Sequence, residues 1–452
     1  MVDCCTFAPS SATMPGLTLY CEDVPDEDTC DYYAGTWAPG SECPEQPKMF
    51  GQDVMGVSHC GCTDGGNPFP MCTQNTQGSL EHTPVVVRGT DDSPAHLFTE
   101  WARAYEGHAS QLTADANPMK AIKAFNINVA LIKNYNKQPN SRRSAELRLN
   151  ENAATPSNEF KVRNGFSNAQ LQAQLRAQLR APQQPTKRLP LSLRATAPPP
   201  ASLVLSLKGQ VNKAKNQEQC GDCYIFSAVA VMEAAYARRT GKLLKFSEEY
   251  LLQKKQCNAE APPKSSMATL DCNGGLPHDV LQCIVNDGGN MVLSEDDPYT
   301  AGVVSDPYGP AAGPKVYTKV RTGVTSVGSV FGPGFPGAEA PPAPPLTVAE
   351  IETEIEHALL AYGPLAIAVA TTDEWTLYYK GILQPPAVVG DLDHAVVLFG
   401  WGADKLGQKY WRVRNHWGEH WGEKGEIRLP KGGSVDVNGA FKMYTYNPAY
   451  VT

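Results

Sequence analysis

A cysteine at the start of an apolar helical pattern constrains this chain more than any other feature. Cys223 lies in NQEQCGDCYIFS, residues 216–227, and the apolar residues after it share one helical stripe that ends at Gly241. The helix dipole favours the thiolate of a cysteine in the first turn, and Asp222 is the predicted N-cap. The stretch predicts a nucleophilic cysteine, although a buried or disulfide-bonded cysteine would fit it equally well.

A thiolate nucleophile needs a base that can also protonate a leaving amine. His394 opens a predicted strand in DLDHAVVLFGWG, and Asn415 follows a predicted strand that begins at Tyr410. A cysteine, a histidine and an asparagine in this order, each beside the end of a helix or strand, form the pattern of a cysteine hydrolase. Taken singly, each has a structural explanation, since a histidine at the start of a strand usually serves packing.

Four separated motifs stand in the same order as in a known family: QxxCGxCY, DCNGG, DHAV and NHWGxxWGEKGEIRLP. Together they resemble the papain/cathepsin family of cysteine proteases, in particular its cathepsin L-like branch. The resemblance implies an α+β, papain-like two-domain fold, in which a helical half and a β-barrel half enclose the active cleft. It also implies that no metal or organic cofactor is needed.

The resemblance assigns roles to five residues. Cys223 would be the nucleophile, His394 the general acid and base, and Asn415 the group that orients the imidazole. The Gln217 side chain would donate a hydrogen bond to the oxyanion, and Trp417 would cover the hydrogen bond between Asn415 and His394. A thiolate–imidazolium ion pair and an acyl-enzyme intermediate are expected from this arrangement.

The resemblance also implies a pocket for the second substrate residue upstream of the cut bond. Backbone groups near Gly275 would hold the substrate chain extended. All expected wall residues are apolar, so Leu, Val or Phe should be preferred there and Arg should be poor. The alternative is that these residues only pack between the two halves. The expected walls are Leu276, Pro277, Leu392, Ala395 and Met443.

The 13 cysteines favour an oxidising compartment. We expect the secretory pathway, a lysosome or vacuole, or the extracellular space; a cytosolic protein with reduced cysteines is the alternative. The first residues do not read as a secretory signal, so we expect that the natural start is missing. The resemblance implies a disulfide between Cys220 and Cys272. The remaining pair in the enzyme would be Cys257 and Cys283, unless Cys283 is a buried free thiol.

Three regions are predicted along the chain. Residues 1–76 are rich in Cys, Pro and Gly and predict a disulfide-rich module, whose CGC run lacks the second pair that a zinc site requires. Residues 77–202 resemble an inhibitory propeptide: 94–136 has helical periodicity, and VRNGFSN at 162–168 is similar to the Gly-x-Asn-x-Phe-x-Asp motif of such propeptides. Residues 203–452 would be the protease domain.

The propeptide is expected to inhibit the enzyme. Residues 94–168 should form a small helical domain, and the segment after it should run through the cleft against the substrate direction and block Cys223. Lowering the pH should loosen it, as carboxylates that hold the fold become protonated. A helical accessory domain is the alternative.

The composition excludes several partners. The net charge is −8, no basic block suggests nucleic acid or an anionic membrane, and no apolar run is long enough to span a bilayer. The expected partners are protein or peptide substrates and the chain's own propeptide, and we expect a monomer.

The sequence therefore predicts a cysteine endopeptidase made as a zymogen. Two departures from the family weaken that prediction: Asp222 adds a negative charge beside the thiolate, and Glu218 replaces a glycine near the oxyanion region. The alternative is a catalytically weak homologue that binds glycan or protein through its Cys-rich head. A transferase that uses the same acyl-enzyme would have the same sequence pattern.

Overall fold

The computed structural model describes the chain in segments, which cover most of the expected protease domain and parts of the expected propeptide. The described residues are 4–7, 18–21, 36–38, 61–63, 85–87, 94–105, 118–137, 144–167, 169–171, 198–253, 270–300, 317–331, 346–432, 439–446 and 448–452.

A buried helix, α9 (Cys223–Thr240), forms the centre of the helical half. It ends at Gly241, which adopts a left-handed φ of 74° and donates its N–H to the carbonyl oxygen of Ala237. Helix α11 (Pro277–Asn286) packs against it and begins with a proline, which is favoured in the first turn. The short helix α10 (Glu249–Gln253) completes the half. Apolar side chains of α9 and α11 share one core.

The second half is a mixed sheet of nine strands. Its path runs β5-β11-β14-β13-β12-β10-β15-β9, with β6 pairing separately to β12. The end strands of this path, β5 and β9, do not pair with each other among the described residues. The described strands therefore form an open sheet, whereas a barrel was predicted. The strands are β5 (Ser144–Leu147), β6 (Leu203–Val204), β9 (Val327–Ser329), β10 (Leu365–Val369), β11 (Tyr378–Ile382), β12 (His394–Ala403), β13 (Lys409–Arg414), β14 (Glu426–Pro430) and β15 (Ala449–Val451).

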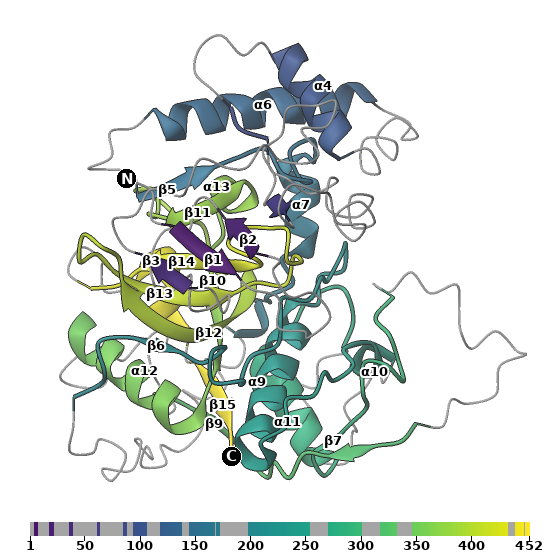
Figure 1. Cartoon of the computed structure of the whole chain (residues 1–452). Coiled ribbons are helices and arrows are strands. Elements are labelled where there is room, and N and C mark those ends of the chain that lie inside the picture. Colours follow the sequence, from purple (N-terminus) through teal and green to yellow (C-terminus); the bar gives the residue numbers. More distant parts are fainter. Residues whose placement is uncertain are drawn as a thin grey trace, which may run out of the picture.

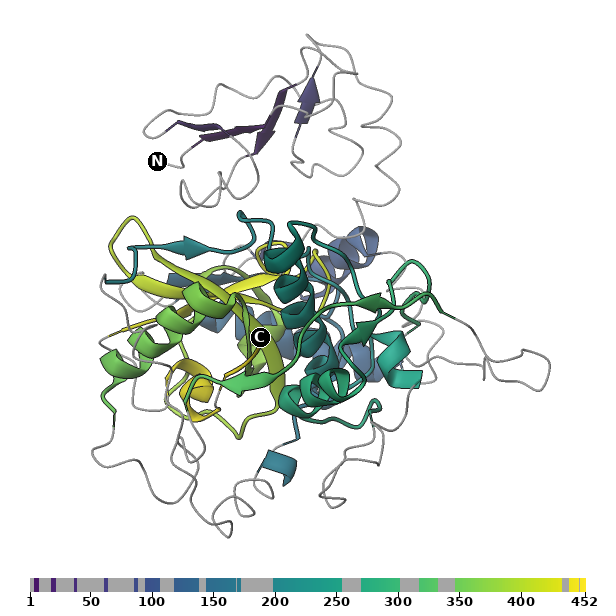
Figure 2. The same ribbon diagram turned by 90° about the horizontal axis from the view of Figure 1, so that it is seen from below.

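Helix α9 packs against β12 and β10, which places the helical half directly on the sheet. Helix α12 (Val348–Tyr362) packs on the same two strands and begins with a capping box between Thr347 and Glu350. Seen from below, the green helix α12 and the yellow strands lie on one side and the teal helices on the other (Figure 2). Two short elements, α13 (Asp373–Thr376) and the helical turns η3 (Ala440–Thr445), border the sheet, and β7 (Asn290–Met291) pairs with β8 (Val320–Arg321).

The helical pattern predicted over 94–136 corresponds to α4 (Pro94–Ala104) and α6 (Pro118–Asn136), which lie together at the top of Figure 1. Trp101 and Phe125 are fully buried between them, with ring centroids 5.5 Å apart. Asn136 fixes the next strand, because its side chain both donates to the carbonyl oxygen of Leu147 and accepts from its N–H.

The propeptide region attaches to the sheet through β5. This strand pairs antiparallel with β11, so that Ser144 lies opposite Ile382. Two short helical elements, α7 (Ser157–Phe160) and η2 (Lys161–Arg163), then lead the chain to the first turn of α9. Backbone pairing and side-chain packing therefore join this region to the sheet and to α9.

Residues 1–76 contribute four short antiparallel strands: β1 (Cys4–Phe7), β2 (Thr18–Cys21), β3 (Thr36–Ala38) and β4 (Gly61–Thr63), in the order β3-β1-β2-β4. The disulfide framework predicted for this region lies outside the part whose side chains the structure describes.

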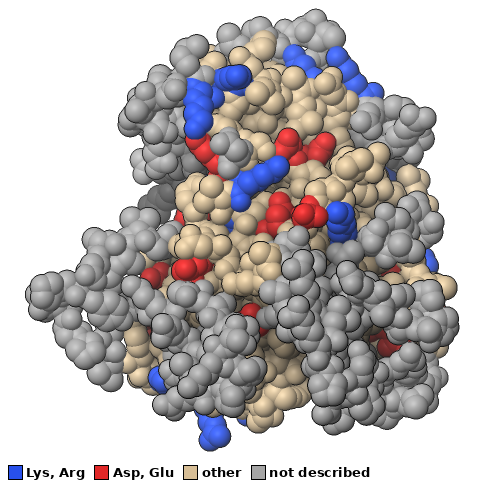
Figure 3. Space-filling view, turned by 180° about the vertical axis from the view of Figure 1, so that it is seen from behind, with Lys and Arg blue, Asp and Glu red and all other residues tan. Residues whose placement is uncertain are grey.

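Charge is mixed over the surface. On the face shown in Figure 3, described Lys and Arg side chains alternate with Asp and Glu rather than forming one continuous basic area. Within the described segments, no helix is long and apolar enough to cross a membrane.

One propeptide carboxyl makes stability depend on pH. Oε2 of Glu151 is buried without a hydrogen-bond partner, and burial raises the pKa of Glu151 to about 7. The neutral acid is therefore favoured in the folded state. Its stabilising effect is complete below the unfolded pKa and is lost as the pH rises through 7. Burial also raises the pKa of Asp393, which contacts the propeptide. Both carboxyls oppose the acid-induced loosening predicted from the sequence.

We expect Glu151→Gln to remove part of this dependence. In a Cys223→Ala background, which prevents self-processing, the parent chain should lose thermal stability between pH 5 and pH 8 more steeply than the Glu151→Gln chain. Thermal unfolding at both pH values measures the difference. The exposed residue Glu295 provides the control as Glu295→Gln. Equal pH slopes for the parent and Glu151→Gln chains would contradict the assignment.

Candidate active site

Cys223 is the first residue of α9 and is fully buried. Its Sγ accepts two backbone hydrogen bonds, one from the N–H of Ala395 at 3.3 Å and one from the N–H of Gly165 at 3.2 Å. Cys223 forms no disulfide bond. The thiol thus lies where α9, the start of β12 and the propeptide region meet.

The His394 ring is oriented by two neighbours. Its Nε2 lies 2.8 Å from Oδ1 of Asn415, and its ring stacks on Trp417 with centroids 4.9 Å apart. The same Asn415 oxygen accepts the N–H of His416, which identifies it as the acceptor. Since an amide oxygen cannot donate, Nε2 carries a proton and Nδ1 of the neutral ring is basic. Nδ1 is buried and has no hydrogen-bond partner among the described residues.

The Gln217 side chain points toward the propeptide backbone. Its Nε2 donates to the carbonyl oxygen of Arg163 at 2.8 Å and to that of Cys220 at 2.9 Å. A propeptide carbonyl therefore accepts from the group that sequence analysis assigned to the oxyanion. The next residue, Glu218, has a φ of 51°, in the left-handed region where glycine is unstrained. This backbone geometry explains the preference for glycine at this position in the family.

The propeptide crosses the site through residues 163–167. The carbonyl oxygen of Gly165 accepts from the N–H of Gly275 at 2.8 Å, and the N–H of Phe166 donates to the carbonyl oxygen of Asp393 at 3.0 Å. Phe166 and Gly275 form a parallel β-bridge. The prediction that the segment after 168 would block Cys223 is therefore wrong in its position. The NGF run lies in the cleft itself, because its glycine permits close contact.

Glycines allow that contact. A Cβ placed on Gly165 would lie 1.6 Å from the carbonyl oxygen of Gly221, and one on Gly274 would lie 2.8 Å from the carbonyl oxygen of Gly165. A side chain at either position would push the propeptide segment away from the segment that it contacts. The hydrogen bond from the N–H of Gly165 to Sγ of Cys223 would then break. Gly221 is held in turn, since its N–H donates to the carbonyl oxygen of Cys272 at 3.1 Å.

Phe166 is buried among apolar residues beside the site. It is buried in one core with three predicted wall residues: Leu276, Leu392 and Ala395. Pro277 lies in the first turn of α11, next to Leu276. Met443 packs instead in the sheet-side core, so the structure does not bring it together with the other expected wall residues. It lies in η3, where left-handed residues at 441 and 442 redirect the chain.

Sequence reasoning missed Tyr446, whose ring meets Phe166 edge-on at 5.3 Å between centroids. Its aromatic character was the signal available, and the irregular turn before it hid its direction. Sequence reasoning also missed Asn164, whose Nδ2 donates to Oδ2 of Asp393 at 2.9 Å and to Oγ1 of Thr371 at 2.7 Å. Asp393 also accepts from the backbone N–H and the hydroxyl of Thr371, so it contacts both the propeptide and Thr371.

One disulfide fixes the loop before α9. Cys220 and Cys272 are bonded, with their Cα atoms 4.7 Å apart. Cys283 is also disulfide-bonded, which excludes the buried free thiol considered above. Its partner and Cys257 lie outside the described residues.

Burial in the closed site favours the neutral form of both groups. Loss of solvent raises the pKa of the Cys223 thiol to about 12 and lowers the pKa of His394 to about 4. At neutral pH the buried pair is therefore a thiol and a neutral imidazole. The ion pair expected from the sequence requires the cleft to be opened to water.

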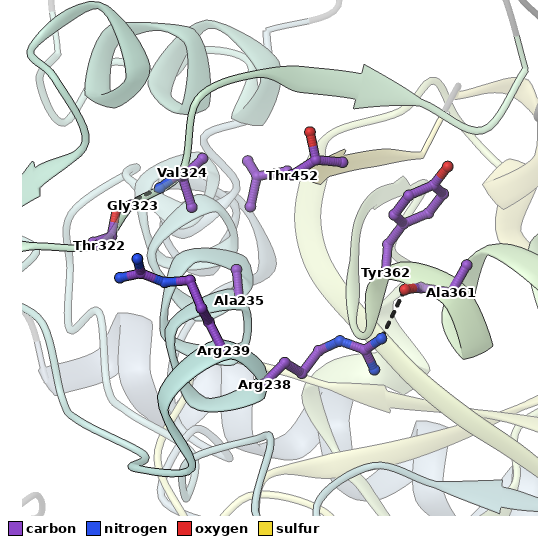
Figure 4. Close-up of a pocket in the computed structure, with 10 residues that line it drawn as sticks. Ala235, Arg238, Arg239, Thr322, Gly323, Val324, Ala361, Tyr362 and Thr452 are labelled. Carbon is purple, nitrogen blue, oxygen red and sulfur yellow. Dashed lines mark hydrogen bonds between the residues drawn. The ribbon is translucent and has the colours of Figure 1, made fainter.

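No other described site competes with this one. No group of three His, Cys, Asp or Glu residues suited to a metal ion occurs in the described part of the chain. A pocket of about 390 Å³ lies between α9, α12 and the strand end at Thr452 (Figure 4). Its Arg238 donates to the carbonyl oxygens of Leu360 and Ala361, and Arg239 donates to that of Arg321. These arginines stabilise the junction of the two halves.

Comparison with known proteins agrees with the geometry. The family described as papain family cysteine protease matches residues 200–446. The chain belongs to this family. It is 30% identical over 327 residues to the senescence-specific cysteine protease SAG39 of Oryza sativa subsp. indica, covering 70% of this chain and 79% of the relative. It is 26% identical to cathepsin L of Sarcophaga peregrina, covering 75% of this chain and 90% of the relative.

Solved proforms share the fold of this papain-family chain. The proform of the ragweed pollen cysteine protease Amb a 11 matches with a TM-score of 0.57 and 22% identity, covering 82% of this chain and 98% of the other. Procathepsin L 3 of Tenebrio molitor matches with a TM-score of 0.53 and 22% identity, covering 77% and 98%. This chain is therefore a papain-family cysteine endopeptidase made as a zymogen, and the binding-protein alternative is not favoured.

Gly165→Ala should weaken inhibition of this papain-family enzyme by its own propeptide. The added methyl group cannot fit against Gly221, and overpacking of this kind costs about 1–3 kcal/mol, which corresponds to roughly 5- to 150-fold in affinity. Activity of the intact chain toward a small peptide, before processing, should rise accordingly. Lys123→Ala on an exposed part of α6 is the control and should leave activity unchanged. Unchanged inhibition in Gly165→Ala would contradict the close contact.

Proposed function

We propose that Cys223 and His394 hydrolyse peptide bonds once the propeptide has left the cleft. Nδ1 of His394 takes the thiol proton, and Sγ attacks the substrate carbonyl. Nδ1 then gives the proton to the leaving amine, and water, deprotonated by the same nitrogen, releases the acyl group and restores the thiol. The observation that carries this proposal is the bond from Nε2 to Asn415, which leaves Nδ1 as the basic atom.

The oxyanion is assigned to Gln217 and the backbone N–H of Cys223. The Gln217 amide already donates to a carbonyl oxygen of the propeptide at 2.8 Å. A substrate carbonyl in the same place would receive the same hydrogen bond, and the bond would strengthen as negative charge develops on the oxygen. The first turn of α9 contributes its positive dipole end at this point.

The propeptide is proposed to inhibit by occupying the substrate cleft in reverse. Its contacts with Gly275 form a parallel bridge, with Gly165 accepting from Gly275 and Ser167 donating to it at 3.1 Å. From the family resemblance, we expect a substrate to run in the opposite direction beside Gly275. A reversed chain fills the pocket and the oxyanion site without presenting a correctly directed peptide bond to Sγ.

We assign the protease domain to residues 203–452, the propeptide to 77–202 and a separate Cys-rich module to 1–76. The match to the papain family begins at residue 200, where the sequence is rich in proline and suited to cleavage. The number of cysteines and the disulfide between Cys220 and Cys272 support a secretory, vacuolar or extracellular location. The proposed substrates are proteins and peptides, and the proposed state is a monomer.

Substitutions separate the reacting groups from the supporting ones. Cys223→Ala should reduce peptide hydrolysis to background, because no other group can form the acyl-enzyme. Gln217→Ala should lower kcat by about 10²–10³-fold, the loss expected for one oxyanion donor. Asn415→Ala should cost less than Cys223→Ala, since it removes an orienting group. Steady-state kinetics of the processed proteins measures all three, and hydrolysis by Cys223→Ala would refute the mechanism.

A matched labelling experiment checks the same assignment without a substrate. An epoxide that alkylates activated cysteines should label the processed parent protein at Cys223. It should not label the unprocessed chain, in which the thiol is buried and protonated. Labelling at a different cysteine would show that the nucleophile is misassigned.

The pocket that holds Phe166 predicts substrate preference. Its described walls are apolar, so Phe, Leu or Val should be preferred at the second position upstream of the cut bond. One methylene more or less in such a pocket changes the preference by about 1–3 kcal/mol. Arg should be poor because its charge would lose water without gaining a partner. A peptide library scored by kcat/KM tests this, and a preference for Arg over Leu would contradict it.

A further inference from the structure

Directly before the nucleophile lies a carboxyl group for which the proposed mechanism has no use. Asp222 is fully buried, and its Oδ1 has no hydrogen-bond partner among the described residues. Although Asp222 stands at the N-cap position of α9, its side chain makes no capping hydrogen bond, so the capping role predicted from the sequence is wrong. Its Oδ2 lies 2.9 Å from the hydroxyl oxygen of Tyr299.

The Tyr299 hydroxyl has two oxygen neighbours and one proton. It lies 2.9 Å from Oδ2 of Asp222 and 3.0 Å from the carbonyl oxygen of Gln217. A carbonyl oxygen can only accept, so the hydroxyl proton belongs in that contact. If Asp222 were ionised, the proton would go to the carboxylate, and two oxygens with facing lone pairs would remain 3.0 Å apart. A protonated Asp222 satisfies both contacts.

The charges around Asp222 favour the same state. Glu248 and Glu249 face it from α10 and the turn before it, and Cys223 adjoins it; all three oppose a negative charge. The ammonium group of Lys215 bonds to Glu248 at 2.7 Å and to Glu233 at 2.6 Å, and among the described residues no hydrogen bond or ion pair joins it to Asp222. Burial away from water raises the pKa of Asp222 well above its usual value. Ionisation would place an unpaired charge in the interior.

We propose that Asp222 is held as a neutral carboxylic acid and, together with Tyr299, positions the loop that carries Gln217. The Asp222 O–H donates to the Tyr299 oxygen, and the Tyr299 O–H donates to the carbonyl oxygen of Gln217. This relay ties the first turn of α9 to the backbone of the proposed oxyanion donor. It does so without a negative charge beside the Cys223 thiolate. Asp222 and Tyr299 are positioning residues, since neither touches substrate.

The packing of Tyr299 fits that role. Its ring meets Phe226 of α9 edge-on, with centroids 4.9 Å apart, which fixes the hydroxyl relative to the helix. The Gln217 carbonyl also accepts from the N–H of Cys220 at 3.2 Å, so this carbonyl has one local bond and one to Tyr299, while the Gln217 N–H donates to the carbonyl oxygen of His416 at 2.8 Å. Loss of the Tyr299 bond would let the Gln217 amide drift from the position where the oxyanion forms.

Infrared spectroscopy tests the protonation state without any catalysis. In the full-length Cys223→Ser chain at neutral pH, the spectrum should contain a protonated-carboxyl carbonyl band that disappears in Cys223→Ser/Asp222→Asn. In Cys223→Ser/Tyr299→Phe the band should persist and move to higher frequency, because the acid loses its acceptor. If Asp222→Asn removes only carboxylate bands, the proposal is overturned. If the Asp222→Asn chain does not fold, the frequency shift of the band in Cys223→Ser/Tyr299→Phe decides whether the protonated carboxyl is that of Asp222.

Kinetics of the processed enzyme tests the positioning role, and this arm rests on the proposed function. Asp222→Asn can still donate to Tyr299, so its kcat should stay within roughly threefold of the parent value. Asp222→Ala and Tyr299→Phe break the relay and should lower kcat by roughly five- to tenfold with little change in KM. Equal kcat values for Asp222→Ala and the parent would overturn the positioning role.

The acid limb of kcat/KM separates the two charge states. A neutral Asp222 predicts that the acid limb coincides in the parent and Asp222→Asn proteins. An ionised Asp222 would hold the thiol pKa up, so its removal would move the limb to lower pH and overturn the proposal. If every variant including the parent lacks peptidase activity, the proposed function fails, while the infrared result still decides the protonation state of Asp222.

Discussion

The contact between the propeptide backbone and the Cys223 thiol is the interaction on which the rest of this structure depends. It exists because Gly165 can approach Gly221 within a distance that no side chain would permit. The disulfide between Cys220 and Cys272 holds Gly221 in place, and β5 anchors the propeptide to the sheet from the other side. The helical propeptide core supports this one contact from a distance, since α4 and α6 lie away from α9 (Figure 1).

Burial is also an electrostatic form of inhibition. The propeptide removes water from Cys223 and His394, which favours the neutral form of each and so disfavours the ion pair that would attack a substrate. Burial within the fold also raises the pKa of Asp222 and of Glu151, which favours the neutral form of both carboxyls. Acid release of the propeptide would therefore have to come from other groups, or from proteolysis of the linker, because the raised pKa values of Glu151 and Asp393 mean that these two carboxyls bind protons more tightly in the folded zymogen.

Much of the site could be predicted from sequence because its chemistry depends on local motifs. The order of Cys223, His394 and Asn415 could be read from their neighbours in the chain, and the family resemblance implied the disulfide at Cys220. Three features could not be read in this way. The direction of Tyr446 depends on left-handed residues in η3, the placement of Met443 depends on the same turn, and the side-chain contact of Asp222 depends on Tyr299, 77 residues away. Each needs long-range packing that periodicity does not encode.

Inhibition and specificity share the same contacts in this chain. Phe166 fills the pocket proposed for the substrate side chain, Gly275 supplies the backbone bonds proposed for the substrate chain, and Gln217 donates to a propeptide carbonyl. A change in the pocket that alters substrate preference must therefore also alter the affinity for the propeptide. Since the propeptide is part of the same chain, its high effective concentration tolerates a modest loss of affinity. The pocket can consequently vary in shape while the zymogen remains closed, provided that Gly165 keeps its contact with Gly221.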